Sequence, residues 1–294
     1  MADYRGDQAA GLRRLFGREQ TRVVTFAAGS AGVGKSVLVA NLGAALAGLG
    51  CDVLIVDENA RSGVSACFGT GPRHDLLQVI NGELLIEEAM VEVAPAVRVL
   101  SAARAVGQLA YLGERQQETL IHSMIGMERP ADTILVDASS DHPLGFSPFG
   151  LASHETVVVM SPCSAAITDA YALIKRVSLG YARRDFRLLL NMVSNREEAE
   201  AIYRNMARLS HGRGVARLAF AGHVPLDQSL HQASCLAQPV EVLNPDAPSA
   251  QACRTIAADL LNWPQGEEDA GGLEHFVLQL LHLSQHIDPQ PIYA

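Results

Sequence analysis

Short apolar runs alternate with segments of helical periodicity over most of this chain. The apolar runs cover residues 22–28, 52–56, 97–100, 133–136, 156–160, 187–193 and 215–224. Several are continuous in Val, Ile and Leu, which is typical of strands covered on both faces. The helical segments between them cover residues 35–49, 114–125, 168–181 and 197–209. This alternation predicts an α/β fold, with a doubly wound, mostly parallel sheet and helices on both of its faces.

Further helical patterns occur at both ends of the chain. Residues 7–16 place apolar side chains at helical spacing and precede a short linker, so they predict a helix that is either tethered or packed on the core. Residues 249–263 predict a last domain helix, and residues 264–272 form an acidic linker. We therefore expect an N-terminal helix and linker at 1–21, an α/β domain at 22–263, and a linker with a C-terminal helix at 264–294.

The C-terminal helix is predicted to be amphipathic, because five apolar side chains fall on one stripe. These are Leu273, Phe276, Val277, Leu280 and Leu281. Such a stripe can insert at a membrane interface, or it can dock in a groove of the protein itself or of a partner. Residues 264–294 contain acids but no Lys or Arg, and each basic residue near an anionic leaflet is worth about 1 kcal/mol. The composition therefore favours docking.

A glycine-rich loop at residues 29–36 fits the pattern G-x-x-x-x-G-K-S, between a predicted strand and a predicted helix. Its glycines let backbone N–H groups turn toward an anion, and the following helix directs its positive end at the same point. The lysine of such a loop reaches the β- and γ-phosphates, and the hydroxyl binds Mg²⁺. We expect nucleotide binding by Gly29, Ser30, Ala31, Gly32, Val33, Gly34, Lys35, Ser36 and Val37.

Two aspartates come at the ends of predicted strands. Asp57 follows the run at 52–56, and Asp137 follows Ile-Leu-Val in the run at 133–136, as a Walker B acid does. Ligands bind at the carboxyl edge of open parallel sheets, so both acids should lie beside the glycine-rich loop. The sequence predicts a Mg²⁺ site made by Ser36, Asp57 and Asp137.

Composition narrows the class of protein. Of the 294 residues, 48% are hydrophobic and 19% are charged, which suits a packed core. The net charge of −9 disfavours nonspecific binding to DNA or to an anionic membrane. The five cysteines have no C-x-x-C spacing, no stretch of 18 apolar residues occurs, and residues 1–16 lack the apolar part of a signal peptide. These features predict a reduced, cytoplasmic protein.

Motifs outside the glycine-rich loop resemble the MinD/ParA ATPases, and within them the flagellar-number regulators FlhG and FleN. They are DQAAGLR (7–13), ITDAYALIK (167–175), LNM (190–192), HVPLD (223–227) and NWPQGEEDAGGLEHFVLQLL (262–281). The resemblance runs over nearly the whole chain. It implies a P-loop ATPase that binds ATP or ADP with Mg²⁺, forms a homodimer with ATP, and carries a membrane-targeting helix at its tail.

The resemblance also implies partners and roles for particular residues. It implies contacts with the adenine base from Asn191, which reads it, and from the loop with Pro225 and Asp227. It implies stimulation of an FlhF-like GTPase by the element that holds Asp7, Gln8, Leu12 and Arg13. Flagellar switch proteins or a flagellar transcription activator are the further partners it implies, and no specific nucleic acid is expected.

Several family positions are altered here. Ser30 stands where the family has a lysine that crosses the dimer to the partner's ATP, and Ala31 follows it. Asn59 stands where the family has an acid that orients the attacking water, and the amide of asparagine cannot accept a proton from that water. The second switch reads DASSD at 137–141 without the family's γ-phosphate-sensing glycine, and the family's E-P-T is CSA at 163–165.

These changes affect catalysis. The resemblance places Lys35, Asn59 and Asp137 at the catalytic positions of the family, and Asn59 is the altered one among them. A general base contributes roughly 10²–10⁴ in rate, and a cation supplied in trans contributes on the order of 10³–10⁵. An ATPase that lacks both should turn over slowly or not at all, although it can still bind nucleotide.

The sequence therefore predicts an ATP-binding regulator of flagellar number, placement and assembly that acts on the FlhF GTPase. We expect it in the cytoplasm, with peripheral contact at the inner face of the plasma membrane as a hypothesis. Two alternatives remain. One is a non-catalytic scaffold of the same fold, which the altered switch residues favour. The other is a ParA-type segregation ATPase, which the net charge of −9 and the DQAAGLR element disfavour.

Overall fold

The computed structural model describes residues 21–59, 63–139, 146–264 and 272–286. Most of the predicted acidic linker lies outside these ranges. The predicted partner-binding residues also lie outside them, namely Asp7, Gln8, Leu12 and Arg13.

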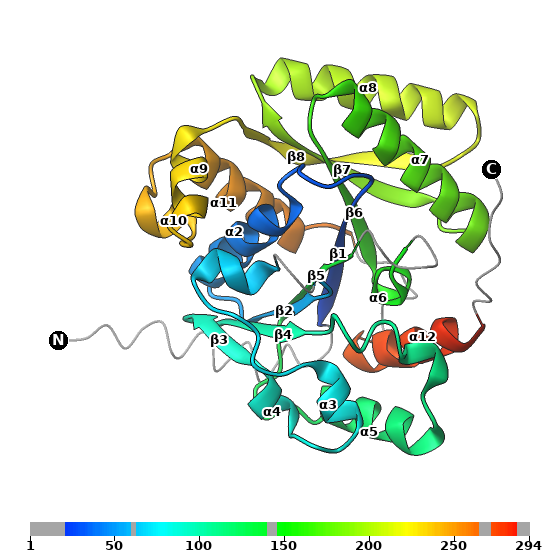
Figure 1. Cartoon of the computed structure of the whole chain (residues 1–294). Helices are drawn as coiled ribbons and strands as arrows, with labels where there is room; N and C mark the ends of the chain where they lie inside the picture. Colours follow the sequence, from blue (N-terminus) through cyan, green and yellow to red (C-terminus); the bar gives the residue numbers. More distant parts are fainter. Residues whose placement is uncertain (1–20, 60–62, 140–145, 265–271, 287–294) are drawn as a thin grey trace.

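The described chain forms one sheet of eight strands in the order β3-β4-β2-β5-β1-β6-β7-β8 (Figure 1). The strands are β1 (Arg22–Ala28), β2 (Val53–Asp57), β3 (Val91–Ala94), β4 (Val97–Ser101), β5 (Thr133–Asp137), β6 (Glu155–Met160), β7 (Asp185–Val193) and β8 (Arg217–Pro225). All neighbouring pairs are parallel except β3 with β4. The predicted doubly wound, mostly parallel sheet is confirmed. The pattern missed β3, because this four-residue edge strand is only partly buried and Glu92 interrupts its apolar run.

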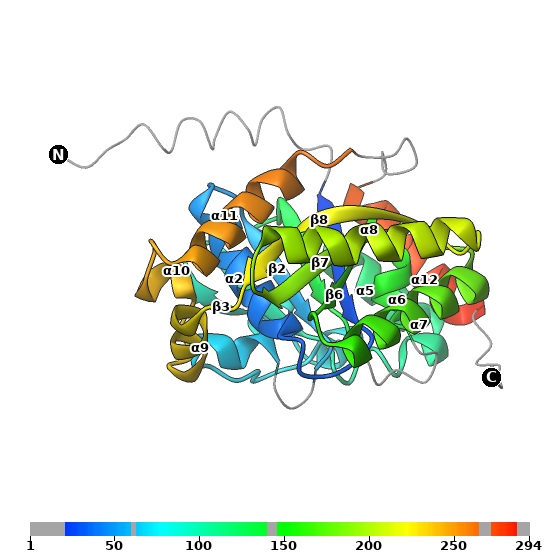
Figure 2. The same cartoon turned by 90° about the horizontal axis from the view of Figure 1, so that it is seen from above.

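Helices cover both faces of the sheet (Figures 1 and 2). On β1, the side chains of Val24 and Phe26 join the core that includes residues of α2 (Lys35–Gly48) and α11 (Pro248–Leu261). Val23 and Ala27 face the opposite side, where the long helices are α5 (Glu114–Ile125), α7 (Ser164–Tyr181), α8 (Arg196–Gly212) and α12 (Gly272–His286). This alternation explains why the strands read as continuous apolar runs.

The helical pattern missed the short helices, which are too short to show a repeat. They are η1 (Val64–Phe68), α3 (Leu76–Ile80), α4 (Ile86–Ala89), η2 (Leu109–Tyr111), α6 (Pro148–Ala152), α9 (Gln228–Cys235) and α10 (Val240–Leu243). Two of these matter below: α6 packs against β1 and α12, and α9 follows the loop after β8.

The C-terminal helix α12 docks on the protein's own core, where it packs against α5, α6, η2 and β1 (Figure 1). Phe276, Val277, Leu280 and Leu281 are buried, and Leu273 packs partly buried beside them. The ring of Phe276 lies 6.3 Å from that of Phe149 on α6, centroid to centroid. The predicted apolar stripe is therefore real, and in this structure it is covered by the protein itself.

Candidate nucleotide-binding site

The glycine-rich loop joins β1 to α2 at the carboxyl edge of the sheet, as the sequence predicts. Lys35, Ser36 and Val37 form the start of α2, and Gly34 precedes it with φ of 79° in the left-handed region. A side chain at Gly34 would also place its Cβ 2.5 Å from Nδ2 of Asn191. Only glycine satisfies both conditions. The loop therefore has the tight turn that lets backbone N–H groups face an anion at the start of α2.

Asp137, at the end of β5, is the centre of a polar cluster beside this loop. Its fully buried carboxylate forms an ion pair with the ammonium group of Lys35 and accepts a hydrogen bond of 2.6 Å from Oγ of Ser36. A third donor is the side-chain amide of Asn59, whose Nδ2 lies 2.7 Å from Oδ2. The structure thus brings together four of the five residues that the sequence assigned to the metal site and to catalysis.

Asp57, at the end of β2, is the neighbour of Asp137 in the parallel register. Its carboxylate accepts hydrogen bonds from the backbone N–H of Asn59 at 2.9 Å and of Val64 at 2.6 Å. Burial, and then the charge of Asp137, raise the pKa of Asp57 to about 6. The two carboxylates of Asp57 and Asp137 and the hydroxyl of Ser36 are the hard oxygen donors that Mg²⁺ prefers. A divalent cation between them would offset the repulsion between the two carboxylates. The residues present therefore fit a Mg²⁺ site.

Glu58 lies between these residues, and the sequence pattern did not single it out. Its side chain is only 3% exposed, and its carboxylate accepts hydrogen bonds from the backbone N–H of Ser139 at 2.9 Å and from the hydroxyl of Ser147. Burial raises its pKa to about 7 against the opposing effect of these bonds. The signal that could have revealed it was a charged residue between Asp57 and Asn59, which the sequence had already assigned to the site.

Asn191, at the end of β7, contacts the glycine-rich loop directly. Its Nδ2 donates to the carbonyl of Val33 at 2.8 Å, and its Oδ1 accepts from the N–H of Met192 at 3.0 Å. The side chain is 2% exposed. The structure places it beside the loop as expected, and its contact with a base remains a prediction.

Pro225 ends β8, and Asp227 follows it as the N-cap of α9. The carboxylate of Asp227 accepts from the N–H of Ser229 at 2.8 Å and from the hydroxyl of Ser249 at 2.6 Å. Asp227 therefore joins α9 to the start of α11 here, and its predicted contribution to base binding stays untested.

The positions at which this sequence departs from the family motifs differ in their exposure to solvent. Ser30 is half-buried and Ala31 exposed in the loop. Cys163 is exposed and precedes the first residue of α7. In the second switch, Ser139 is described, and residues 140 and 141 lie outside the described ranges.

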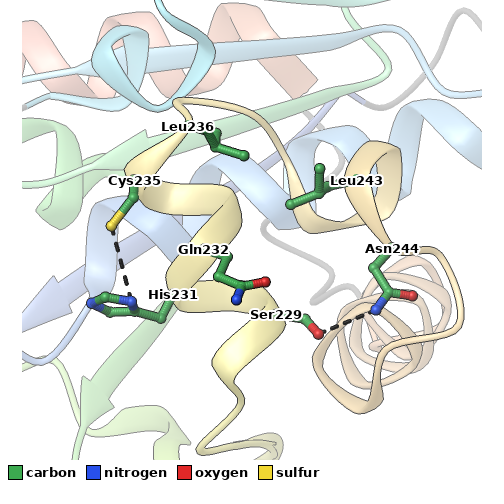
Figure 3. Close-up of a pocket in the computed structure, with 7 residues that line it drawn as sticks. All are labelled: Ser229, His231, Gln232, Cys235, Leu236, Leu243 and Asn244. Carbon is green, nitrogen blue, oxygen red and sulfur yellow. Dashed lines mark hydrogen bonds between the residues drawn. The ribbon is translucent and has the colours of Figure 1, made fainter.

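A separate pocket of about 590 Å³ opens between α9 and α10 (Figure 3). Leu236 and Leu243 face each other across it, and Nδ2 of Asn244 lies 3.2 Å from Oγ of Ser229. Its lining residues include none of those assigned to the phosphate site. Within the described residues, no helix is long and apolar enough to cross a bilayer.

The strand, glycine-rich loop and helix, with two acids on adjoining strands, define a P-loop nucleotide-binding protein. Comparison with known proteins identifies the branch. Residues 24–240 match the CobQ/CobB/MinD/ParA nucleotide binding domain, and the chain belongs to this family.

Two relatives bear on the branch that the sequence motifs suggested. The chain is 26% identical to the antiactivator FleN of Pseudomonas aeruginosa, over 92% of this chain and 97% of that protein. It is 27% identical to the flagellum site-determining protein YlxH of Helicobacter pylori, over 65% of this chain and 64% of that protein. The resemblance to the FlhG/FleN branch of the MinD/ParA family is confirmed.

Solved structures of MinD proteins show the same fold. The MinD cell division protein of Aquifex aeolicus aligns with a TM-score of 0.62 at 21% identity, over 84% of this chain and 99% of that one. The septum site-determining protein MinD of Pyrococcus horikoshii, solved as a complex with Mg-ADP, aligns with a TM-score of 0.60 at 21% identity. The alignment covers 82% of this chain and 96% of that one.

Proposed function

We propose that this protein binds ATP with Mg²⁺ and regulates flagellar number, placement and assembly by switching between a monomer and an ATP-bound dimer. One observation carries the proposal above all others: the likeness to FleN extends over 92% of this chain and 97% of that protein. The arrangement of Lys35, Ser36, Asp57 and Asp137 supports the nucleotide part of it.

Nucleotide binding requires a simple exchange of partners at the loop. The ammonium group of Lys35 now pairs with Asp137, and it would leave that carboxylate to meet the β- and γ-phosphates. Ser36 and Asp137 would then be free to hold a cation with Asp57, and a cation there neutralises phosphate charge. The N–H groups at the start of α2 would face the same phosphates.

Hydrolysis should be slow in this protein. The side-chain amide of Asn59 donates hydrogen bonds to Asp57 and Asp137, and an amide cannot take a proton from an attacking water. Ser30 supplies no cation to a partner subunit. The missing base alone accounts for roughly 10²–10⁴ in rate, so nucleotide binding rather than turnover would set the state of the protein.

The partners follow from the proposed family role. An FlhF-like GTPase would meet the segment with Asp7, Gln8, Leu12 and Arg13, and removing residues 1–20 should abolish any stimulation of that GTPase while nucleotide binding persists. Flagellar switch proteins or a transcription activator are proposed as further partners. We propose a cytoplasmic location, with peripheral contact at the inner face of the plasma membrane when α12 is undocked.

A non-catalytic scaffold of the same fold is the second candidate. The observation that favours it is that Asp137 already accepts from three donors, namely Lys35, Ser36 and Asn59. The two candidates differ in whether ATP changes the oligomeric state. A ParA-type segregation role is disfavoured, since a net charge of −9 opposes DNA binding.

Size-exclusion chromatography with ADP and with ATP, combined with phosphate release on the same samples, tests the proposal. We expect ATP with Mg²⁺ to produce a dimer, ADP to leave a monomer, and phosphate release to stay below roughly 1 per second, the low end of ordinary enzyme turnover. Lys35→Ala should abolish the ATP effect. Binding without dimerisation would favour the scaffold, and a protein that binds no ATP would contradict both candidates.

A further inference from the structure

The pocket between α9 and α10 lies in an apolar part of the surface. Leu236 and Leu243, which face each other across it, are 60% and 39% exposed (Figure 3). Thirteen large apolar side chains are exposed in the part of the chain that the structure describes, and four of them fall within residues 226–243. These four are Leu226, Leu236, Val242 and Leu243. A concentration of exposed apolar side chains marks an interaction surface.

The same part of the chain is acidic. Residues 218–253 contain no Lys or Arg, but they contain Asp227, Glu241 and Asp246. The next basic residue is Arg254, whose guanidinium group pairs with Glu241 at 2.6 Å. Three acids and one arginine leave residues 218–254 with a net charge of −2. This surface therefore suits an apolar segment that carries positive charge.

One segment of this chain has the complementary composition. Residues 9–18, which lie outside the described ranges, combine apolar and basic side chains and contain no acid. The apolar ones are Leu12, Leu15 and Phe16, and the basic ones are Arg13, Arg14 and Arg18. Helical spacing places the three apolar side chains close together. The segment overlaps the element that we propose to act on the GTPase.

The chain between this segment and the described domain is long enough to reach the pocket. Arg22 donates to the carbonyl of Trp263 at 2.9 Å, just beyond the end of α11. The other end of α11 follows Asn244 of the pocket wall closely, and α11 packs against both α9 and α10 (Figure 2). α11 has 14 residues, so its ends are roughly 20 Å apart at 1.5 Å per residue. Residues 17–21, when extended, span roughly 17 Å, and residues 7–16, as a helix, add roughly 15 Å.

We propose that residues 9–18 dock in the α9–α10 pocket of the same chain, with their apolar side chains against Leu236 and Leu243. Their arginines then lie over the acidic surface beside the pocket. This contact is autoinhibitory, because it covers the element that stimulates the GTPase until that partner displaces it. The docking stands on the pocket and on the composition of the segment. Its regulatory consequence rests on the proposed function.

Cys235 provides a direct test of the docking, because it is exposed and lines the pocket. In the full chain, Ala9→Cys should form an internal disulfide with Cys235 in a glutathione redox buffer, detected by mass spectrometry of the non-reduced digest. Cys163 at the start of α7 is also exposed and is the internal control. We expect it to pair at least roughly tenfold less, because docking raises the effective concentration of Cys235 alone.

Two outcomes of this cross-linking experiment would overturn the proposal. Equal pairing of Ala9→Cys with Cys235 and with Cys163 would show random collisions of a segment that does not dock. Disulfide-linked dimers in place of the internal disulfide would assign the pocket to the segment of a second copy.

A variant of the pocket wall tests the same contact without cross-linking. Leu236→Arg removes an apolar contact and repels the arginines of the segment, and this exposed position tolerates a polar side chain. By hydrogen exchange on the full chain, the amides of residues 9–18 should exchange about tenfold faster in this variant than in the wild type. Leu85→Arg is the matched control, because Leu85 is 68% exposed beside α4, and it should match the wild type. Equal exchange in all three proteins would overturn the docking.

Stimulation of a purified FlhF-like GTPase separates this proposal from the proposed function. Docking lowers the apparent affinity of the segment for its partner by the fraction that is undocked, so Leu236→Arg should stimulate at about tenfold lower concentration than the wild type. Equal stimulation by both proteins, with the internal disulfide present, would overturn the autoinhibition. If neither protein stimulated while the disulfide still formed, the proposed action on the GTPase would be overturned and the docking would be supported.

Discussion

Nδ2 of Asn59 lies 2.7 Å from Oδ2 of Asp137, the carboxylate that also pairs with Lys35. The same nitrogen lies 3.1 Å from Oδ1 of Asp57. Asn59 thus bridges the two acids that are expected to hold Mg²⁺. An aspartate at this position would add a third negative charge to the cluster instead of the two donors.

Replacing Asn59 with aspartate should therefore increase ATP hydrolysis and reduce the stability of the metal-free protein. The new carboxylate can act as a base, and a general base usually contributes roughly 10²–10⁴ in rate. Because Ser30 still supplies no cation, we expect a smaller rise in phosphate release, of roughly tenfold. In chelator, repulsion among the three acids should lower the melting temperature, and Mg²⁺ with nucleotide should restore it. Phosphate release and thermal unfolding measure the two effects. Asn59→Ser, which adds no charge, should not increase hydrolysis; a similar increase there would rule out the base.

Lys35 should be needed for nucleotide affinity, because it is the cation placed at the start of α2. A charge-assisted hydrogen bond contributes about 1.5–3 kcal/mol, so Lys35→Ala should weaken ATP binding roughly 10- to 100-fold in calorimetric titration. The chain has one other lysine, Lys175, which lies exposed on α7. Lys175→Ala is the matched control and should bind normally. If the wild type, Lys35→Ala and Lys175→Ala all bound ATP with equal affinity, the glycine-rich loop would not be the binding site.

The sequence predicted the fold well because strands covered on both faces give continuous apolar runs, and a glycine-rich loop marks the edge where ligands bind. It also placed Lys35, Ser36, Asp57 and Asp137 in one site. It did not predict the bonds of Glu58 or Asn59, since these depend on distances between residues up to 89 positions apart in the chain. Asp227 shows the same limit: the sequence did not predict that its carboxylate joins α9 to the start of α11.

The stability of the metal-free protein should fall as the pH rises from 5 to 8. Burial raises the pKa of Glu58 from 4.5 to about 7 and that of Asp57 from 3.8 to about 6. A carboxyl group with a raised pKa in the folded state contributes stability that is complete below its unfolded value and is lost as the pH passes through the folded value. For Glu58 this loss is roughly 3 kcal/mol. Urea unfolding in chelator at several pH values measures it.

Glu58→Gln isolates the contribution of that residue to the pH dependence. The amide is neutral at every pH and keeps the same shape, so its free energy of unfolding should decline less from pH 5 to 8 than that of the wild type. At pH 8 the variant should be the more stable of the two. Parallel pH profiles for the two proteins would mean that Glu58 does not titrate in this range.

Phe276 should be the main anchor of the C-terminal helix. Its side chain is 0% exposed and packs against Phe149, and truncation of a buried phenylalanine to alanine costs about 3–5 kcal/mol. If α12 is part of the cooperative fold, Phe276→Ala should lower the free energy of unfolding in urea by an amount near this range. Leu278 on the same helix is 47% exposed, and Leu278→Ala should change stability by less than about 0.5 kcal/mol. If Phe276→Ala and Leu278→Ala both changed the free energy of unfolding only slightly, α12 would unfold independently of the sheet. Its undocking would then precede the main unfolding transition. In that case exchange of its amides would be fast even without nucleotide, which provides a second measurement of the same point.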